Sequence, residues 1–182
     1  MSAFPIHTLD NAPEKSRPAL HALQQAFGRV PNLAGAMAGS PTLINGFIGV
    51  FQQVHAGSFN EAQIQVLLLT NAVTNACAWA VAFHTALALQ QGVDAVDVTA
   101  IRDGRSPADV RHAALSGLAK ALIERRGHVD DARLQAFVEA GFSREQVLEA
   151  ILVVAASTIA NYAGTVSQPP LEDAFQPHAW QR

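Results

Sequence analysis

The chain has 182 residues, of which 49% are hydrophobic and 15% charged, and its formal net charge is −3. This length fits a single domain over residues 1–182 with a sizeable core, and the small negative charge argues against nucleic acid and anionic membranes as partners. Because about a quarter of the residues in a typical domain are charged, so low a charged fraction predicts a homo-oligomer whose subunits cover part of each other's surface.

Helix start and stop signals divide the chain into a series of helices. Ser40-Pro41 and Ser106-Pro107 each combine a favoured N-cap residue with a proline at the first helical position. No stretch alternates apolar and polar residues as a half-buried strand would, so the predicted fold class is all-α. After an irregular arm, the expected helices cover about residues 14–27, 33–37, 41–55, 60–73, 77–91, 93–101, 107–126, 130–140 and 144–164, and the Pro-rich tail from 168 packs on its own bundle or on a neighbour.

The stretch 60–92 is the most apolar part of the chain, and its only Asp, Glu, Lys or Arg residue stands at its start. Asn60 with Gln63 forms a capping box, which begins a helix. The polar triplet 74–76 interrupts the apolar run, and a second helix then covers 77–91. Repeated Gln, Asn, Thr and His residues and this interruption indicate a soluble antiparallel helical hairpin over about 60–92, and not a membrane span.

The second helix of the hairpin carries the only cysteine, Cys77, together with His84. Residues 77, 80 and 84 share one helix face, and Cys77 and His84 are roughly 10 Å apart along the axis. Ala80 lies one turn from each and offers only a methyl group. A lone cysteine forms no intrachain disulfide and fits a reducing compartment. Because the N-terminus has no apolar leader, we expect a cytoplasmic protein.

The segment Asn75–His84, NACAWAVAFH, resembles the N-x-C-x-[YW]-C-x-x-x-H motif of the alkylhydroperoxidase-D/carboxymuconolactone decarboxylase family. The segments FGRVPNL, from Phe27, and ANY, from Ala160, are similar to the peroxidase-related branch of that family. The resemblance covers nearly the whole chain and implies an AhpD-like helical bundle that assembles as trimers or multiples of three. Two positions depart from the pattern, because the second cysteine is replaced by Ala80 and the upstream glutamate by Gln65.

The resemblance also implies a chemistry. In the family scheme the second cysteine attacks a hydroperoxide, the first resolves it, and a glutamate and a histidine relay protons. Those positions are Ala80, Cys77, Gln65 and His84 here. With alanine at the attacking position the two-cysteine cycle cannot run, so Cys77 supports only one-cysteine chemistry with an external thiol as resolver. Gln65 cannot carry a proton, which removes the acid/base role of a glutamate.

Two functions therefore stay open. The first is a hydroperoxide-reducing, peroxiredoxin-type oxidoreductase. The second is a scaffold without peroxidase activity, either a small-molecule binder or a decarboxylase-type enzyme that uses His84 as acid/base. An open polar cleft that reaches His84 would favour an enzyme, and a sealed apolar environment would favour a scaffold. The other histidines lack metal-ligand spacing, and no nucleotide- or phosphate-binding motif occurs, so we expect neither a metal nor a cofactor.

Five residues have a structural interpretation beside a functional one. Trp79 is expected in the core or in a subunit interface. Asn75 is expected to cap the second helix of the hairpin. Asn161 and Tyr162 form a polar pair in an otherwise apolar helix, where they either line a pocket or satisfy a buried loop. Cys77, at a helix start, is expected to have its thiol pKa lowered by the helix dipole, unless it is an inert buried cysteine.

Overall fold

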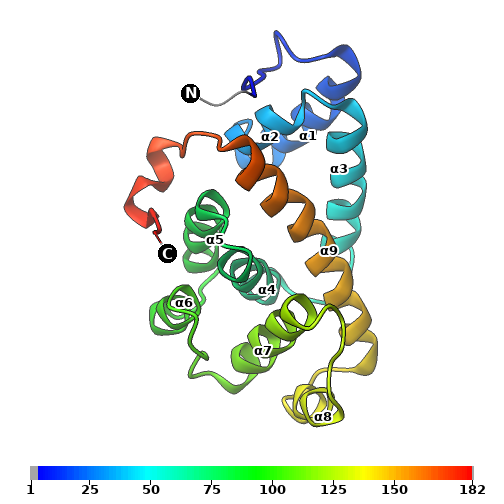
Figure 1. The fold of residues 1–182 in the computed structure, drawn as a ribbon, viewed down its shortest axis with the longest axis vertical. Coiled ribbons are helices and arrows are strands. Elements are labelled where there is room, and N and C mark those ends of the chain that lie inside the picture. Colours follow the sequence, from blue (N-terminus) through cyan, green and yellow to red (C-terminus); the bar gives the residue numbers. More distant parts are fainter. Residues whose placement is uncertain (1–3, 182) are drawn as a thin grey trace.

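The computed structural model describes residues 4–181, and within this range it contains helices and no strand (Figure 1). This confirms the all-α prediction. The expected arm over residues 1–13 lies partly outside the described residues. The α-helices are α1 (Arg17–Phe27), α2 (Asn32–Met37), α3 (Pro41–His55), α4 (Glu61–Thr74), α5 (Ala78–Gln90), α6 (Ala95–Arg102), α7 (Val110–Glu124), α8 (Asp131–Glu139) and α9 (Arg144–Ser167), and 3₁₀ helices cover Glu14–Ser16 and Asp173–His178.

The helical hairpin of α4 and α5 lies at the centre of the bundle, as the sequence predicts. Figure 1 shows it between α1–α3 at one end and α6–α8 at the other, while the long α9 runs beside α3. Helix α4 contacts α5, α6, α7 and α9, and its residues 64–72 are all buried. A helix enclosed on all sides needs apolar residues around its whole circumference. The uncharged run is therefore the core of the bundle.

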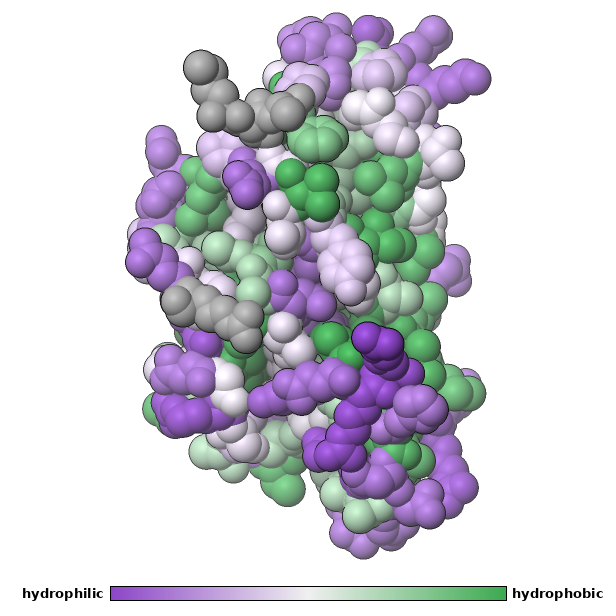
Figure 2. All heavy atoms as spheres, in the orientation of Figure 1, coloured by the Kyte–Doolittle hydropathy of each residue, from purple (hydrophilic) through white to green (hydrophobic). Residues whose placement is uncertain are grey.

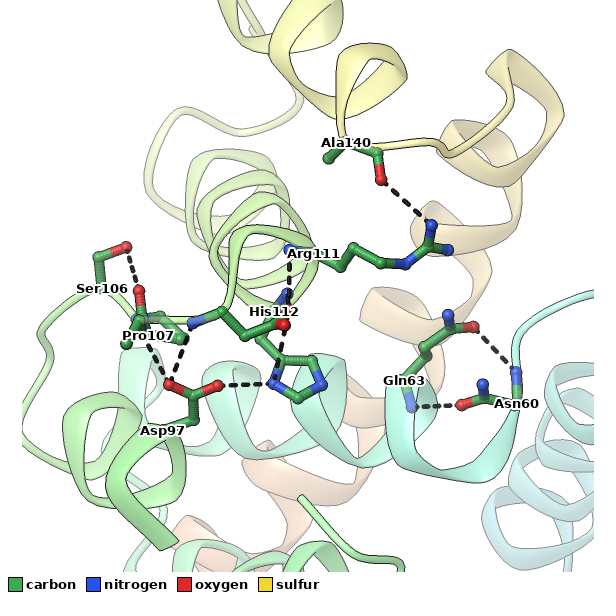
Figure 3. Close-up of polar contacts among 10 residues, drawn as sticks. Asn60, Gln63, Asp97, Ser106, Pro107, Arg111, His112 and Ala140 are labelled. Carbon is green, nitrogen blue, oxygen red and sulfur yellow. Dashed lines mark hydrogen bonds and ion pairs between the residues drawn. The ribbon is translucent and has the colours of Figure 1, made fainter. Parts of the chain in front are cut away.

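The two helices of the hairpin begin in different ways. Asn60 Oδ1 accepts a hydrogen bond from the Gln63 backbone at 2.9 Å, and Gln63 Oε1 accepts one from the Asn60 backbone at 3.1 Å, which is the predicted capping box (Figure 3). The prediction that Asn75 caps α5 is wrong. Ala76 takes the left-handed conformation with φ of 53°, and this turn leaves Asn75 at the end of α4 and Cys77 at the N-cap of α5.

A second predicted helix start is also wrong, because α7 begins after Asp109 and not at Pro107. The buried Asp97 of α6 binds the loop that precedes α7 and keeps this loop out of helical geometry. Its carboxylate accepts from the Ala108 backbone at 2.7 Å and lies 2.7 Å from His112 Nδ1 (Figure 3). Burial alone would raise the pKa of Asp97, but the hydrogen bonds from His112 and the loop backbone outweigh it and lower the pKa.

The C-terminal tail packs on its own bundle, which decides between the two placements predicted for it. The carboxylate of Glu172 accepts from Trp79 Nε1 at 2.9 Å and from the Asn32 backbone at 2.7 Å. The guanidinium of Arg102 donates to two backbone carbonyls of the tail, at 3.0 and 3.1 Å. Trp79 is thus a core residue with its indole N–H satisfied.

Helix α9 carries an exposed apolar face. Among residues 4–181, α9 is the helix that is long and apolar enough to cross a membrane by length and composition alone. It contacts α2, α3, α4, α5 and α7, so one side of the helix packs on the bundle. Its outer side nevertheless exposes Leu148 (68%), Ile151 (46%), Tyr162 (61%) and Val166 (68%). The helical spacing of these four residues places them on one side, and we call them the α9 stripe.

Candidate functional site

His84 and Gln65 lie side by side in the hairpin, one on each of its two helices. The Nδ1 atom of His84 is 3.0 Å from Oε1 of Gln65, and the two side chains belong to residues that are 9% and 4% exposed. Because an amide oxygen only accepts, Nδ1 carries the hydrogen and Nε2 is an acceptor. Burial lowers the pKa of His84 to about 3, so the imidazole is neutral at physiological pH.

Cys77 is sealed in the core. Burial raises the pKa of its thiol, although hydrogen bonds with the Ala80 backbone, the Thr165 side chain and the Trp79 backbone act in the opposite direction. The predicted lowering by the helix dipole is therefore wrong, because the loss of water outweighs the favourable position at the helix start. The sulfur faces α9, where a Cβ built on Gly164 would lie 2.9 Å from Sγ. A thiol in this setting stays protonated and unreactive at neutral pH.

Ala80 lines a small cavity beside His84, which we call the inner cavity. Its volume is about 60 Å³, and its walls are almost entirely apolar. Trp79, Ala80 and Phe83 of α5 form one side, and Ser157 of α9 is the polar residue on another. The methyl group of Ala80 thus borders the space next to the imidazole. A thiol at this position would have faced His84, which explains why its absence matters for the chemistry.

A larger cavity of about 510 Å³, which we call the outer cleft, lies on the other side of His84. The two cavities share Phe27, Phe51, Phe83 and His84. The outer cleft has walls of mixed polarity, because aromatic and aliphatic side chains stand beside Arg29, His55, Glu61, Gln65, Gln90 and Gln91. His84 therefore lies between a small apolar cavity and a wider cleft of mixed polarity, and the environment is neither the open polar cleft nor the sealed apolar pocket that the sequence left open.

A histidine–carboxylate pair in the outer cleft is missed by motif reasoning. His55 Nδ1 lies 2.8 Å from Glu61 Oε1, with the side chains 29% and 48% exposed. The ring of Phe51 packs on His55 with centroids 4.4 Å apart. The signal in the sequence is the spacing of Glu61 and Gln65, which puts both on one face of α4. Sequence alone does not show that the end of α3 brings His55 to the same face.

An aromatic cluster centred on Phe83 lines the inner cavity and the outer cleft. Phe83 stacks on Trp79 with centroids 4.9 Å apart and an interplanar angle of 18°. The rings of Phe27 and Phe175 meet Phe83 edge-on at 5.5 and 5.1 Å. Phe175 belongs to the C-terminal tail, so the packed tail completes the outer cleft. These rings come from distant parts of the sequence, and no local motif joins them.

Asn161 and Tyr162 do not act as a pair. Asn161 is fully buried and donates to Ser157 Oγ at 3.2 Å, whereas Tyr162 belongs to the exposed α9 stripe. Neither lines the inner cavity or the outer cleft. Within residues 4–181, no group of three or more His, Cys, Asp or Glu side chains is placed to hold a metal ion.

Comparison with known proteins identifies the fold. No protein-family model matches the chain, and no curated protein matches it. An uncharacterized peroxidase-related protein with an alkylhydroperoxidase AhpD core, from Ralstonia eutropha JMP134, superposes with a TM-score of 0.83 at 18% identity, covering 96% of this chain and 94% of that one. A cysteine-to-alanine variant of the debrominase Bmp8, in complex with 2,3,4-tribromopyrrole, gives 0.80 at 17% identity over 98% and 97%. An Agrobacterium tumefaciens protein of unknown function, ATU0492, described as a putative antioxidant defence protein AhpD, gives 0.64 at 19% identity over 73% and 94%. The chain therefore has the AhpD-like fold, as the resemblance of its central motif implies.

Proposed function

We propose that this protein binds a small aromatic or heteroaromatic molecule at His84 and does not reduce hydroperoxides through a thiol cycle. The observation that carries this proposal is the position of His84, whose neutral imidazole lies between the inner cavity and the outer cleft. The groups that peroxide chemistry requires are not available there. Ala80 offers a methyl group, and the thiol of Cys77 faces α9 with a raised pKa.

The walls define the chemistry of the ligand. Phe27, Phe51 and Phe83 suit a flat apolar ring. Because Gln65 engages Nδ1 of His84, Nε2 is the acceptor that remains, so the ligand should carry an N–H or O–H donor. The inner cavity, at about 60 Å³, is smaller than the roughly 150 Å³ that holds a benzene ring in an apolar core. The ring therefore occupies the outer cleft and directs one edge toward the inner cavity.

Two observations favour binding over proton transfer or peroxide reduction. A general base works best when its pKa is near the operating pH, and burial holds the pKa of His84 at about 3. A raised pKa of Cys77 leaves little thiolate to attack an O–O bond. The structural similarity to a debrominase in complex with a pyrrole is consistent with this ligand class. A decarboxylase-type reaction with His84 as acid/base is the less favoured alternative, because it needs a substrate that raises this pKa.

A pair of ligands that differ only in the donor tests the proposal. The chain has two tryptophans, so a Trp180→Phe background leaves Trp79, in the wall of the inner cavity, as the only reporter. We expect pyrrole to change the Trp79 fluorescence and N-methylpyrrole, which lacks the N–H, to bind at least about tenfold more weakly. His84→Phe should abolish the difference between the two ligands. Equal affinities for both ligands, or no response to either, would refute the proposed site.

We also propose that the protein is a homo-oligomer, a trimer or a multiple of three, in which the α9 stripe is covered. Support comes from the charged fraction of 15% and from four large side chains exposed along one helix face. Apolar patches of this kind on soluble proteins commonly mark interfaces. The trimeric order itself rests on the family resemblance of the central motif.

A further inference from the structure

A second cleft lies away from His84, on the other side of α4. It has a volume of about 810 Å³ and shares no lining residue with the inner cavity or the outer cleft. Its walls come from α4, from the turn after α6, from α7 and α8, and from the end of the C-terminal tail. Figure 2 shows hydrophilic side chains gathered over α6–α8. We call this space the α7 cleft. Its volume falls in the range of about 300–1,000 Å³ that is usual for sites of small molecules.

The α7 cleft concentrates positive charge in an acidic protein. Five basic side chains line it, whereas the whole chain has twelve and a net charge of −3. Two acidic side chains, Asp103 and Glu124, also line it. Asp103 pairs with Arg105 at 2.7 Å, and Asp130, which is not among the lining residues, pairs with Arg125 at 2.6 Å. Five basic groups against these three carboxylates leave a surplus of two positive charges. Clefts lined by one sign of charge raise the local concentration of ions of the opposite sign. The basic residues are Arg102, Arg105, Lys120, Arg125 and Arg133.

These basic groups differ in how far the protein itself uses them. Arg102 is committed, because it donates to Thr85 and to the tail backbone. Lys120 has only a long contact of 3.9 Å with Glu124, and both side chains are about half exposed. An exposed ion pair of this kind is weak, so the ammonium of Lys120 is available to a ligand.

Of the five, Arg133 is the one with a buried nitrogen that lacks a hydrogen-bond partner among residues 4–181. Its Nη1 donates to the Gly117 carbonyl at 2.9 Å, and the buried nitrogen without a partner is Nε. An arginine presents parallel N–H groups that match two oxygens of a carboxylate or a phosphate. A small shift of the Arg133 side chain toward the cleft would give this N–H an acceptor, and the same shift would bring the guanidinium to an anion held by Lys120.

The other walls describe the rest of the ligand. The hydroxyls of Thr70 on α4 and Ser116 on α7 lie 3.0 Å apart. Both residues are buried. Val73, Ile101 and Trp180 add apolar surface. From these observations we infer that the α7 cleft binds a small organic anion that carries two or more carboxylate or phosphate groups on a short carbon frame. Lys120 and Arg133 are its main charge partners.

Calorimetric titration of the 182-residue chain tests this inference, with citrate as the carboxylate probe and pyrophosphate as the phosphate probe. We expect binding of at least one probe, weakened by added salt and reduced at least about fivefold by Lys120→Gln and by Arg133→Gln. Arg144→Gln, at the start of α9 and outside the cleft, is the matched control and should leave the affinity unchanged. The probe that binds more tightly identifies the preferred group.

Two results would overturn the inference: no heat of binding for either probe up to about 10 mM, or equal weakening by the control and the cleft variants. If Arg133→Gln does not fold, Lys120→Gln decides alone, because its side chain is 46% exposed and its loss spares the core. The inference that the α7 cleft binds an anion is independent of the proposed function at His84. The pyrrole experiment probes a separate set of residues, so the two experiments can fail independently.

Discussion

Replacing Gln65 by glutamate puts a carboxylate beside His84 and tests the assignment of the buried pair. In the wild-type protein the amide oxygen lies 3.0 Å from Nδ1, and burial alone holds the pKa of His84 at about 3. The variant keeps the shape of the side chain and the acceptor oxygen, and it adds a negative charge at the same place. The protonated imidazole should therefore gain a partner that it now lacks.

The expected change follows from the distance. Two opposite charges 3.0 Å apart attract by about 5.5 kcal/mol at an effective dielectric constant of about 20. At about 1.36 kcal/mol per pKa unit, this equals about 4 units. Because burial also raises the pKa of the new carboxyl, part of the gain is offset. We expect the pKa of His84 to rise by at least about 2 units in Gln65→Glu.

The assay is an NMR titration of the histidine ring signals, with His84→Gln used to assign the resonance. Gln63→Glu is the matched control, since it adds the same charge to α4 at a capping position that accepts glutamate. The control should move the pKa of His84 by less than about 0.5 unit. A wild-type His84 that titrates near its ordinary pKa would refute the buried neutral imidazole. An unchanged pKa in Gln65→Glu, with the new carboxyl ionised, would refute the Gln65–His84 contact.

Four other predictions concern pH-dependent stability, thiol reactivity, packing at Gly164 and assembly. The pKa of His84 in the folded protein lies below its unfolded value of 6.5, so folding favours the neutral imidazole. The contribution of His84 to the free energy of unfolding is therefore full above pH 6.5, and it falls toward pH 3 by up to about 1.4 kcal/mol per pH unit. In urea unfolding at several pH values, His84→Gln should lose less stability between pH 6.5 and pH 3 than the wild-type protein. Cys77, at 2% exposure, should react with a thiol reagent only as fast as the protein opens, as a comparison of native and urea-unfolded samples would show. Gly164→Ala should cost about 1–3 kcal/mol by crowding Sγ, measured by urea unfolding, and Cys77→Ala should remove most of this penalty. In sedimentation equilibrium, the Leu148→Glu variant should contain a larger fraction of monomer than the wild-type protein. A wild-type protein that is monomeric at micromolar concentration would contradict the proposed assembly.

Local sequence signals account for much of the fold. Asn60 and Gln63, as well as Ser40, make the capping hydrogen bonds that their spacing predicts, because such bonds join residues close in the chain. The failures have long-range causes. The start of α7 is displaced by a carboxylate from another helix, Asp97. The conformation of Ala76, rather than the preference of Asn75 for caps, decides where α5 begins.

The sequence predicts only part of the candidate site, because His55, Glu61 and the aromatic rings that line it carry no motif. The motif placed Cys77, Ala80 and His84 on one helix, and Gln65 on the facing one. Spacing alone cannot show that Cys77 faces α9 while Ala80 faces the inner cavity, because this depends on how α5 begins. Burial of His84 depends on rings from α1, α3 and the tail. The pKa values follow from that packing and were beyond the reach of the sequence.

The most direct test of the central claim is the reaction of Cys77 with hydroperoxides. Stopped-flow mixing of the 182-residue chain with hydrogen peroxide or an organic hydroperoxide, in the presence of a dithiol donor, measures turnover. Mass spectrometry of the same samples follows oxidation of Cys77. We predict turnover at background level and a cysteine that stays a thiol, since it is buried with a raised pKa. Turnover in the usual enzymatic range of about 1–10³ s⁻¹ that disappears in Cys77→Ser would contradict this account and show that the AhpD-like fold works here with one cysteine.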